Sequence, residues 1–189
     1  RRMFIGREKE LETLNRLYKT DKFEFVVIYG RRRVGKTELI NHFIDDKKAI
    51  YFMGVESNEK QNLENFSKSI IEFSSGIQAE TSFSSFQTAL EYAFKLAGNE
   101  RVVLAIDEYP YVARSSKSLA STLQMLIDKY KDSTKLMLIL CGSSMSYMED
   151  HVLAYKAPLY GRRTAQMKIL PFDFEECCTY LSGLSDEDK

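Results

Sequence analysis

The chain has 189 residues, and its 27 Lys and Arg balance 27 Asp and Glu, so the formal net charge is zero. That length predicts one domain with its own core, or one domain and the start of a second, and the balanced charge excludes an electrostatic argument for nucleic acid or an anionic membrane as an obligatory partner. The three cysteines and two histidines lack the spacing of a zinc site, and no apolar run approaches the roughly 20 residues of a membrane-spanning helix.

Short apolar runs rich in β-branched residues predict five strands, at 23–29, 49–53, 102–106, 135–141 and 165–170. Because these runs do not alternate with polar residues, they indicate strands buried on both faces, as in a parallel sheet. Amphipathic stretches predict helices at 6–20, 37–46, 59–73, 85–98 and 119–132. We expect Ser82 or Ser84 to cap the helix over 85–98. Strands that alternate with helices predict a layered α/β fold.

The segment GRRRVGKT, from Gly30 to Thr37, fits the phosphate-binding pattern G-x-x-x-x-G-K-[ST] between a strand and a helix. Its glycines allow close wrapping around an anion, and the free N–H groups at the helix start attract it. We expect Lys36 to reach the β- and γ-phosphates and Thr37 to ligate Mg²⁺. The expected backbone contacts come from Arg33, Val34, Gly35, Lys36, Thr37 and Glu38. A chance glycine-rich turn is the alternative.

Two arginines in the variable part of this loop, Arg31 and Arg32, are not required as phosphate ligands. Lys36 and the backbone N–H groups account for the phosphate chemistry. We expect both arginine side chains to point outward, where solvent, a lid domain or a neighbouring subunit would meet them.

A pair of adjacent acids, Asp107 and Glu108, ends the predicted strand at 102–106. The carboxyl ends of parallel strands form the sheet edge where ligands bind. Asp107 is the expected Walker B carboxylate, which holds Mg²⁺ directly or through water. Glu108 is then placed to polarise an attacking water as general base. An acidic turn after a core strand is the alternative, and Tyr109 to Tyr111 are expected to shape that turn.

Polar residues also flank the fourth and fifth predicted strands. Ser143 is the first choice, and Ser144 the second, for a side chain that senses the γ-phosphate; helix capping is the alternative role for both. Arg162 and Arg163 precede the fifth strand, where an arginine can act as a finger on the nucleotide of a neighbouring subunit. A surface arginine pair is the alternative, and the sequence does not choose between the two residues.

These motifs occur in the order found in the archaeal-type ATPase family, a STAND-like and AAA-plus-related group of P-loop ATPases near the origin-recognition ATPases. The chain resembles that family from Phe4 to about Tyr180, most specifically in GRRRVGKT and in the LYGRR element. The resemblance implies a three-layer P-loop NTPase fold with a five-stranded parallel sheet of order 5-1-4-3-2. It implies ATP and Mg²⁺ as cofactors, and it places Phe4, Ile5, Gly6 and Arg7 beside the adenine.

Relatives continue into a helical lid or winged-helix region, whereas this chain stops in LSDEDK. We therefore expect residues 1–180 to form the ATPase core and 181–189 to begin a truncated linker or lid. Expected partners are ATP, a second subunit through the arginine finger, and a C-terminal domain or protein partner outside this chain. No membrane partner is expected, and reduced thiols favour the cytoplasm.

The leading functional hypothesis is an ATPase switch module that binds MgATP, hydrolyses it slowly and acts on the missing C-terminal domain. A regulatory nucleotide-binding scaffold with negligible hydrolysis is the main alternative. A P-loop kinase of a small substrate is disfavoured because Glu108 follows the Walker B aspartate. A DNA-processing ATPase is supported only by the resemblance and by local basic residues.

Overall fold

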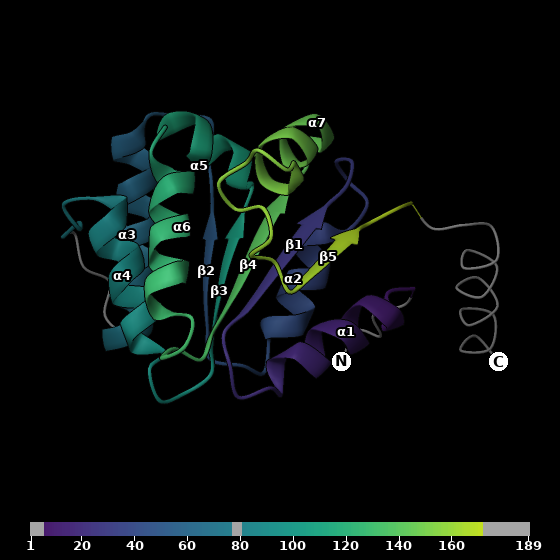
Figure 1. Cartoon of the computed structure of the whole chain (residues 1–189), viewed down its shortest axis with the longest axis horizontal. Coiled ribbons are helices and arrows are strands. Elements are labelled where there is room, and N and C mark those ends of the chain that lie inside the picture. Colours follow the sequence, from purple (N-terminus) through teal and green to yellow (C-terminus); the bar gives the residue numbers. More distant parts are fainter. Residues whose placement is uncertain (1–5, 77–80, 172–189) are drawn as a thin grey trace, which may run out of the picture.

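The computed structural model describes residues 6–76 and 81–171 and contains a five-stranded parallel sheet between two layers of helices (Figure 1). The strands are β1 (Glu24–Tyr29), β2 (Ala49–Met53), β3 (Val102–Asp107), β4 (Leu136–Gly142) and β5 (Ala165–Lys168). Their order across the sheet is β2-β3-β4-β1-β5, and every neighbouring pair is parallel. This confirms the expected order 5-1-4-3-2 and the expected P-loop NTPase architecture.

The helices divide between the two faces of the sheet (Figure 1). On one face lie α1 (Glu8–Tyr18) and α2 (Lys36–Ile44), which share a core cluster with alternate residues of the strands. On the other face lie α3 (Glu59–Ser75), α4 (Phe86–Leu96), α5 (Tyr109–Ser115) and α6 (Leu119–Tyr130). Within the described ranges, none of the helices has both the length and the apolar character that crossing a membrane requires.

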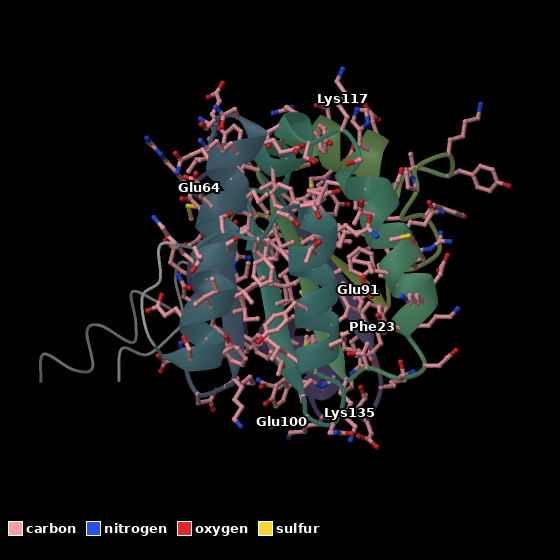
Figure 2. The ribbon with its side chains drawn as sticks, turned by 90° about the vertical axis from the view of Figure 1, so that its left-hand side faces the viewer. Phe23, Glu64, Glu91, Glu100, Lys117 and Lys135 are labelled. Atoms are coloured by element: carbon pink, nitrogen blue, oxygen red, sulfur yellow. The ribbon has the colours of Figure 1, made fainter. Side chains whose placement is uncertain are left out.

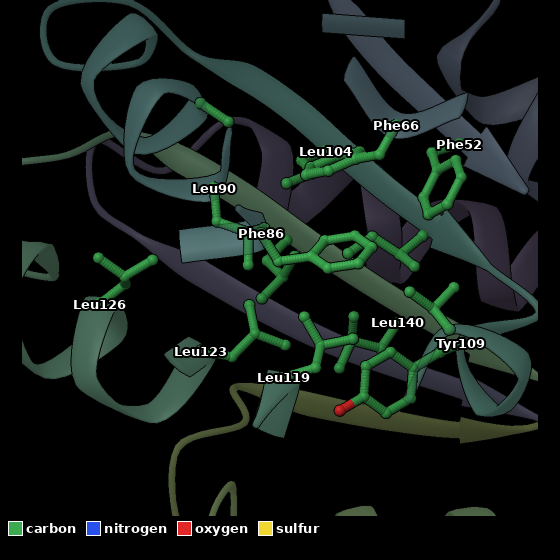
Figure 3. Close-up of a cluster of buried hydrophobic side chains, with 14 of the residues drawn as sticks. Phe52, Phe66, Phe86, Leu90, Leu104, Tyr109, Leu119, Leu123, Leu126 and Leu140 are labelled. Carbon is green, nitrogen blue, oxygen red and sulfur yellow. The ribbon is translucent and has the colours of Figure 1, made fainter. Parts of the chain in front are cut away.

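The three central strands are buried along their whole length, because helices cover both of their faces. The larger core lies under α3 to α6, where the rings of Phe52, Phe66 and Phe86 pack with Leu104 and Leu140 (Figure 3). Each such side chain stabilises the fold by roughly 1.5–3 kcal/mol through burial. This core holds the carboxyl ends of β3 and β4 in a fixed position.

The helices α3, α4 and α6 face the viewer in Figure 2. Lys117, which follows α5, lies at the end of the molecule where the strands finish. Glu100 and Lys135, which precede β3 and β4, lie at the opposite end. Between them, Glu91 of α4 accepts hydrogen bonds from Lys129 at 3.2 Å and from the hydroxyl of Tyr130, both on α6.

Two local predictions were wrong. The cap of α4 is Ser85, whose hydroxyl accepts the backbone N–H of Thr88 at 3.1 Å, and not Ser82 or Ser84. The residues after Glu108 form the helix α5 rather than a simple turn. Pro110 lies in its first turn, where a backbone N–H would have no partner within the helix, so proline is tolerated there.

Two short elements follow β4 that the sequence did not indicate, α7 (Met145–Met148) and the π-helical turn η1 (Glu149–Leu153). Elements of four and five residues are too short to show a helical period in the sequence.

Candidate nucleotide-binding site

A cleft of about 290 Å³ opens at the carboxyl edge of the sheet, between the β1–α2 loop, the start of α5 and the end of β4. It is lined by Arg32, Arg33, Gly35, Lys36, Thr37, Glu38, Glu108, Tyr111 and Ser143. All of these except Arg32 and Tyr111 were predicted as site residues from the sequence. The fold therefore brings the P-loop, the second acid and the first-choice sensor into one cleft.

The backbone of the P-loop is sharply turned before α2. Arg33 has φ 66° and Gly35 has φ 98°, and Gly35 is the residue that precedes the first helical turn. A non-glycine residue in the left-handed region costs about 1–3 kcal/mol, and such conformations cluster at ligand sites. Successive turned N–H groups at a helix start form a concave surface that binds anions.

Gly30, the first glycine of the motif, is confined by β5. A Cβ atom added there would lie 2.4 Å from the backbone oxygen of Ile169, far inside normal contact. The sequence suggested that this glycine serves close wrapping around phosphate. The structure adds a second reason, because the loop leaves β1 directly against the end of β5.

Lys36 is buried in spite of its charge, with only 4% of its surface exposed. Its Nζ donates a hydrogen bond to the carbonyl oxygen of Arg31 at 2.5 Å. A buried ammonium needs such an acceptor. This contact holds the charge over the cleft, between the loop and the start of α2.

Asp107 is completely buried at the end of β3. Its Oδ2 accepts hydrogen bonds from the Thr37 hydroxyl at 2.7 Å and from the Tyr51 hydroxyl at 2.5 Å. Its Oδ1 accepts the backbone N–H of Glu108 at 2.9 Å. Within residues 6–76 and 81–171 no lysine, arginine or histidine forms an ion pair with this carboxylate.

A buried carboxylate without a cationic side chain fits a bound divalent cation. Thr37 and Asp107, the two predicted Mg²⁺ residues, are in contact with each other, as that role requires. In the part of the chain that the structure describes, no group of three or more His, Cys, Asp or Glu could hold a metal ion. Mg²⁺ takes one or two protein oxygens together with water and substrate phosphates, and Thr37 with Asp107 supplies oxygens of that kind.

Two neighbouring groups keep their protons beside Asp107. Burial raises the pKa of Tyr51, and the hydrogen bond to Asp107 raises it further, so the phenol remains a donor. Burial also raises the pKa of the Cys141 thiol well above its usual value, with a further contribution from the charge of Asp107. Cys141 is therefore a neutral core residue.

Glu108 adopts a left-handed backbone conformation, with φ 51°, at the start of α5. Its Oε1 accepts a hydrogen bond from the Ser143 hydroxyl at 2.6 Å. Ser143 thus contacts the candidate base. Ser144 precedes α7 but its side chain makes no capping hydrogen bond.

Arg31 and Arg32 of the loop differ in their contacts. Arg31 is exposed, and only its backbone carbonyl takes part in the site. Arg32 donates from Nη2 to the hydroxyl oxygen of Tyr111 at 2.9 Å, which links the P-loop to α5 across the cleft. No motif in the sequence marks Tyr111 or Tyr51, because each reaches the site through strand order and helix placement.

The segment predicted to lie beside the adenine is described only in part, since Phe4 and Ile5 lie outside the described residues. Gly6 has φ 90° and leads into α1. Arg7 is 4% exposed, and its Nη2 donates to the carbonyl oxygens of Val34 at 2.8 Å and Leu170 at 2.6 Å. This guanidinium ties the P-loop to the residues that follow β5.

The arginine pair before β5 lies at the amino edge of the sheet, opposite the cleft of its own chain. Arg162 forms two hydrogen bonds with Asp128 of α6, at 3.0 and 2.7 Å, and a third with the Pro158 carbonyl at 2.9 Å. The first of these contacts raises the pKa of Arg162 and lowers that of Asp128. Arg163 lies with its guanidinium 6.0 Å from the ring centre of Tyr160.

Similar proteins are known among archaea. The chain is 35% identical over 173 residues to an uncharacterized protein of Methanocaldococcus jannaschii, covering 92% of this chain and 37% of that protein. A shorter match, 50% identical over 46 residues, joins 24% of this chain to 78% of an uncharacterized ATP-binding protein of the same organism. The chain therefore spans well under half the length of the first of these relatives.

Among solved structures, the chain is similar to the Walker-type ATPase of Pyrococcus abyssi, with TM-score 0.67 and 21% identity, covering 95% of this chain and 57% of that one. It is similar to the Orc1 protein of Aeropyrum pernix, solved in complex with DNA, with TM-score 0.67 and 14% identity, covering 98% and 50%. These two likenesses establish the fold. The model of an ATPase domain found predominantly in Archaea matches residues 4–187, and the chain belongs to that family.

Proposed function

We propose that this domain binds MgATP in the cleft and hydrolyses it slowly, as a conformational switch for a C-terminal, DNA-related domain outside the chain. The observation that carries the proposal is the convergence of Lys36, the Thr37–Asp107 pair and Glu108 at one cleft. The family and the similar ATPases support ATP as the ligand. The similarity to an Orc1 protein supports the DNA-related output.

In this proposal the P-loop backbone and Lys36 hold the phosphates, and Thr37 with Asp107 holds Mg²⁺. When bound, Mg²⁺ supplies positive charge that offsets the charge developing on the phosphate oxygens. Glu108 accepts a proton from the attacking water. Ser143 donates to one oxygen of that carboxylate, which leaves the other oxygen to face the water.

A regulatory scaffold with negligible hydrolysis is a second candidate, and the same serine favours it. The Ser143 hydroxyl occupies Oε1 of Glu108 at 2.6 Å, so this oxygen is not free to accept a proton from water while the contact is made. If the Ser143–Glu108 hydrogen bond breaks when ATP binds, slow turnover follows. If it persists, the domain binds ATP without turnover.

For the arginine finger, we propose Arg163 rather than Arg162. Arg162 is committed to Asp128 and to a backbone carbonyl, whereas Arg163 contacts only an aromatic ring among the interactions found for it within the described ranges. Its position at the amino edge requires a second subunit to supply the nucleotide.

The test combines Lys36→Ala and Glu108→Gln, measured by ATP titration calorimetry and by phosphate release. Lys36→Ala should lose ATP binding by about 100-fold or more, because the charge at the phosphates is gone. Glu108→Gln should keep ATP affinity and lose about 10²–10⁴-fold in turnover, the usual contribution of a general base.

Matched controls are Lys131→Ala and Glu72→Gln, which change exposed residues away from the cleft. Both should behave as the wild type. A wild type that does not bind ATP overturns the proposal, equal turnover in the wild type and Glu108→Gln overturns the assignment of the base, and binding without turnover selects the scaffold.

A further inference from the structure

We propose that Tyr51 is a positioning residue for the Mg²⁺ site, because its hydroxyl fixes which oxygen of Asp107 faces the metal. The inference rests on the proposed MgATP-binding function. The sequence motifs do not include this residue. It lies in the middle of β2, the outermost strand on one side of the sheet.

The position of Tyr51 follows from the alternation of side chains along β2. Ile50 and Phe52 are buried in the core under α3 to α6, whereas Tyr51 packs against the cluster on the side of α1 and α2. In the parallel pairing of β2 with β3, Tyr51 lies opposite Ala105, and Met53 lies opposite Asp107. A side chain of tyrosine length at this point spans the two residues to Asp107, beside the start of α2.

The hydrogen bonds of Asp107 show how the Tyr51 hydroxyl determines which carboxylate oxygen is available to the metal. A carboxylate oxygen has two lone pairs, and those of Oδ2 are both occupied, by the hydroxyls of Thr37 at 2.7 Å and Tyr51 at 2.5 Å. Oδ1 accepts one hydrogen bond, from the Glu108 N–H at 2.9 Å. Beside the Cys141 thiol, a weak donor whose hydrogen bond to Asp107 helps to raise the thiol pKa, one lone pair of Oδ1 is left for Mg²⁺ or for a water bound to it.

Without the Tyr51 hydroxyl, Oδ2 regains a lone pair, and one of the donors that hold the carboxylate plane is lost. The carboxylate would then present either oxygen to the metal. Partners of this kind, one step removed from the metal, typically contribute about 10–100-fold to metal affinity. The phosphate cradle is built from other residues, so metal-free ATP binding does not depend on Tyr51.

The experiment is an ATP titration of the wild type and Tyr51→Phe by calorimetry, in EDTA and across a series of Mg²⁺ concentrations. We expect Tyr51→Phe to bind ATP in EDTA within about twofold of the wild type. We expect it to need about tenfold more Mg²⁺ for half of the Mg²⁺-dependent gain in affinity. Phosphate release should show the same shift in Mg²⁺ requirement.

Tyr130→Phe is the matched control, since it also removes a phenol that donates to a carboxylate, that of Glu91. This pair lies between α4 and α6, away from the cleft, so its Mg²⁺ requirement should equal that of the wild type. Tyr51→Leu separates the hydroxyl from the ring. The proposal expects the Phe and Leu variants to share the raised Mg²⁺ requirement, whereas a packing role expects only the Leu variant to change.

Each outcome is decisive. A Tyr51→Phe variant that binds ATP with the wild-type Mg²⁺ requirement overturns the role of Tyr51 and leaves the proposed function standing. A variant that loses ATP binding equally in EDTA and in Mg²⁺ also overturns it, because the residue would then support the loop in general. A wild type that binds no ATP under either condition overturns the proposed function together with this inference.

Discussion

Lysine and arginine residues beside this cleft differ in how deeply they are buried, and this difference distinguishes their roles. Lys36 is buried and held by a backbone carbonyl, so its position is set by the fold. Arg31 and Arg32 are exposed beside it in the same loop. Charge placed in a desolvated position acts strongly on an anion, whereas exposed charge is screened by solvent. In the proposed function, the contacts to the phosphates therefore come from the lysine and the backbone.

Replacing Arg31 and Arg32 together by alanine should change ATP affinity by no more than about threefold, or roughly 0.7 kcal/mol. The carbonyl of residue 31 that accepts the Lys36 hydrogen bond is retained in the variant. The Arg32–Tyr111 hydrogen bond that is lost is exposed. ATP titration calorimetry checks this, with Lys36→Ala as the reference for a true phosphate contact. A loss above tenfold would mean that the arginine side chains themselves hold the nucleotide.

At the scale of elements, the junction of β2 with α5 sets the position of Glu108. Gly54, which follows β2, donates its N–H to the backbone oxygen of Asp107 at 2.8 Å. A Cβ atom added to it would lie 2.5 Å from Cγ2 of Val112 and 2.6 Å from the backbone oxygen of Glu108. The absence of a side chain at residue 54 thus lets α5 begin directly against β2, with the candidate base in its left-handed conformation.

Gly54→Ala should therefore push the start of α5 away from the sheet. We expect a loss of about 1–3 kcal/mol in the free energy of unfolding, as for other overpacked sites, and a fall in turnover larger than the change in ATP affinity. Thermal unfolding and phosphate release measure the two effects. Gly98→Ala is the control, because its Cβ would meet only the Lys95 carbonyl, at 3.2 Å. Wild-type stability in Gly54→Ala would contradict this account of the junction.

At the scale of the whole molecule, the cleft and the arginine pair lie at opposite edges of the sheet. An arginine at the amino edge reaches a nucleotide only in a neighbouring copy, so the finger proposal makes turnover depend on assembly. We expect specific ATPase activity to rise with protein concentration in the wild type. Arg163→Ala should abolish this rise and leave the fold intact, as judged by phosphate release at a series of protein concentrations and by thermal unfolding.

Arg162→Ala is the counterpart, and its main expected effect is on stability. The exposed pair with Asp128 contributes about 1 kcal/mol or less. Because the hydrogen bond lowers the pKa of Asp128, this contribution is present above its ordinary value of 3.8 and is lost as the pH falls through the lowered value. The stability difference between wild type and variant should therefore vanish in acid. A concentration-dependent activity lost in Arg162→Ala but kept in Arg163→Ala would reverse the assignment.

The sequence by itself determined the parts of this protein that local patterns encode. Continuous apolar runs predicted all five strands. The loop from Gly30 to Thr37 predicted a phosphate site, because an anion at a helix start requires this local spacing. The order of the sheet came from resemblance to a family and was confirmed.

Only the tertiary structure decided which side chains meet. Tyr51 contacts Asp107 across 56 positions of sequence, and Arg32 contacts Tyr111 across 79. Such contacts depend on strand order and pairing register, which bring together residues far apart in the chain and which no local pattern encodes. The predicted phosphate loop is encoded in one short segment, whereas the contacts that orient Asp107 and Glu108, the proposed metal ligand and base, are assembled by the fold.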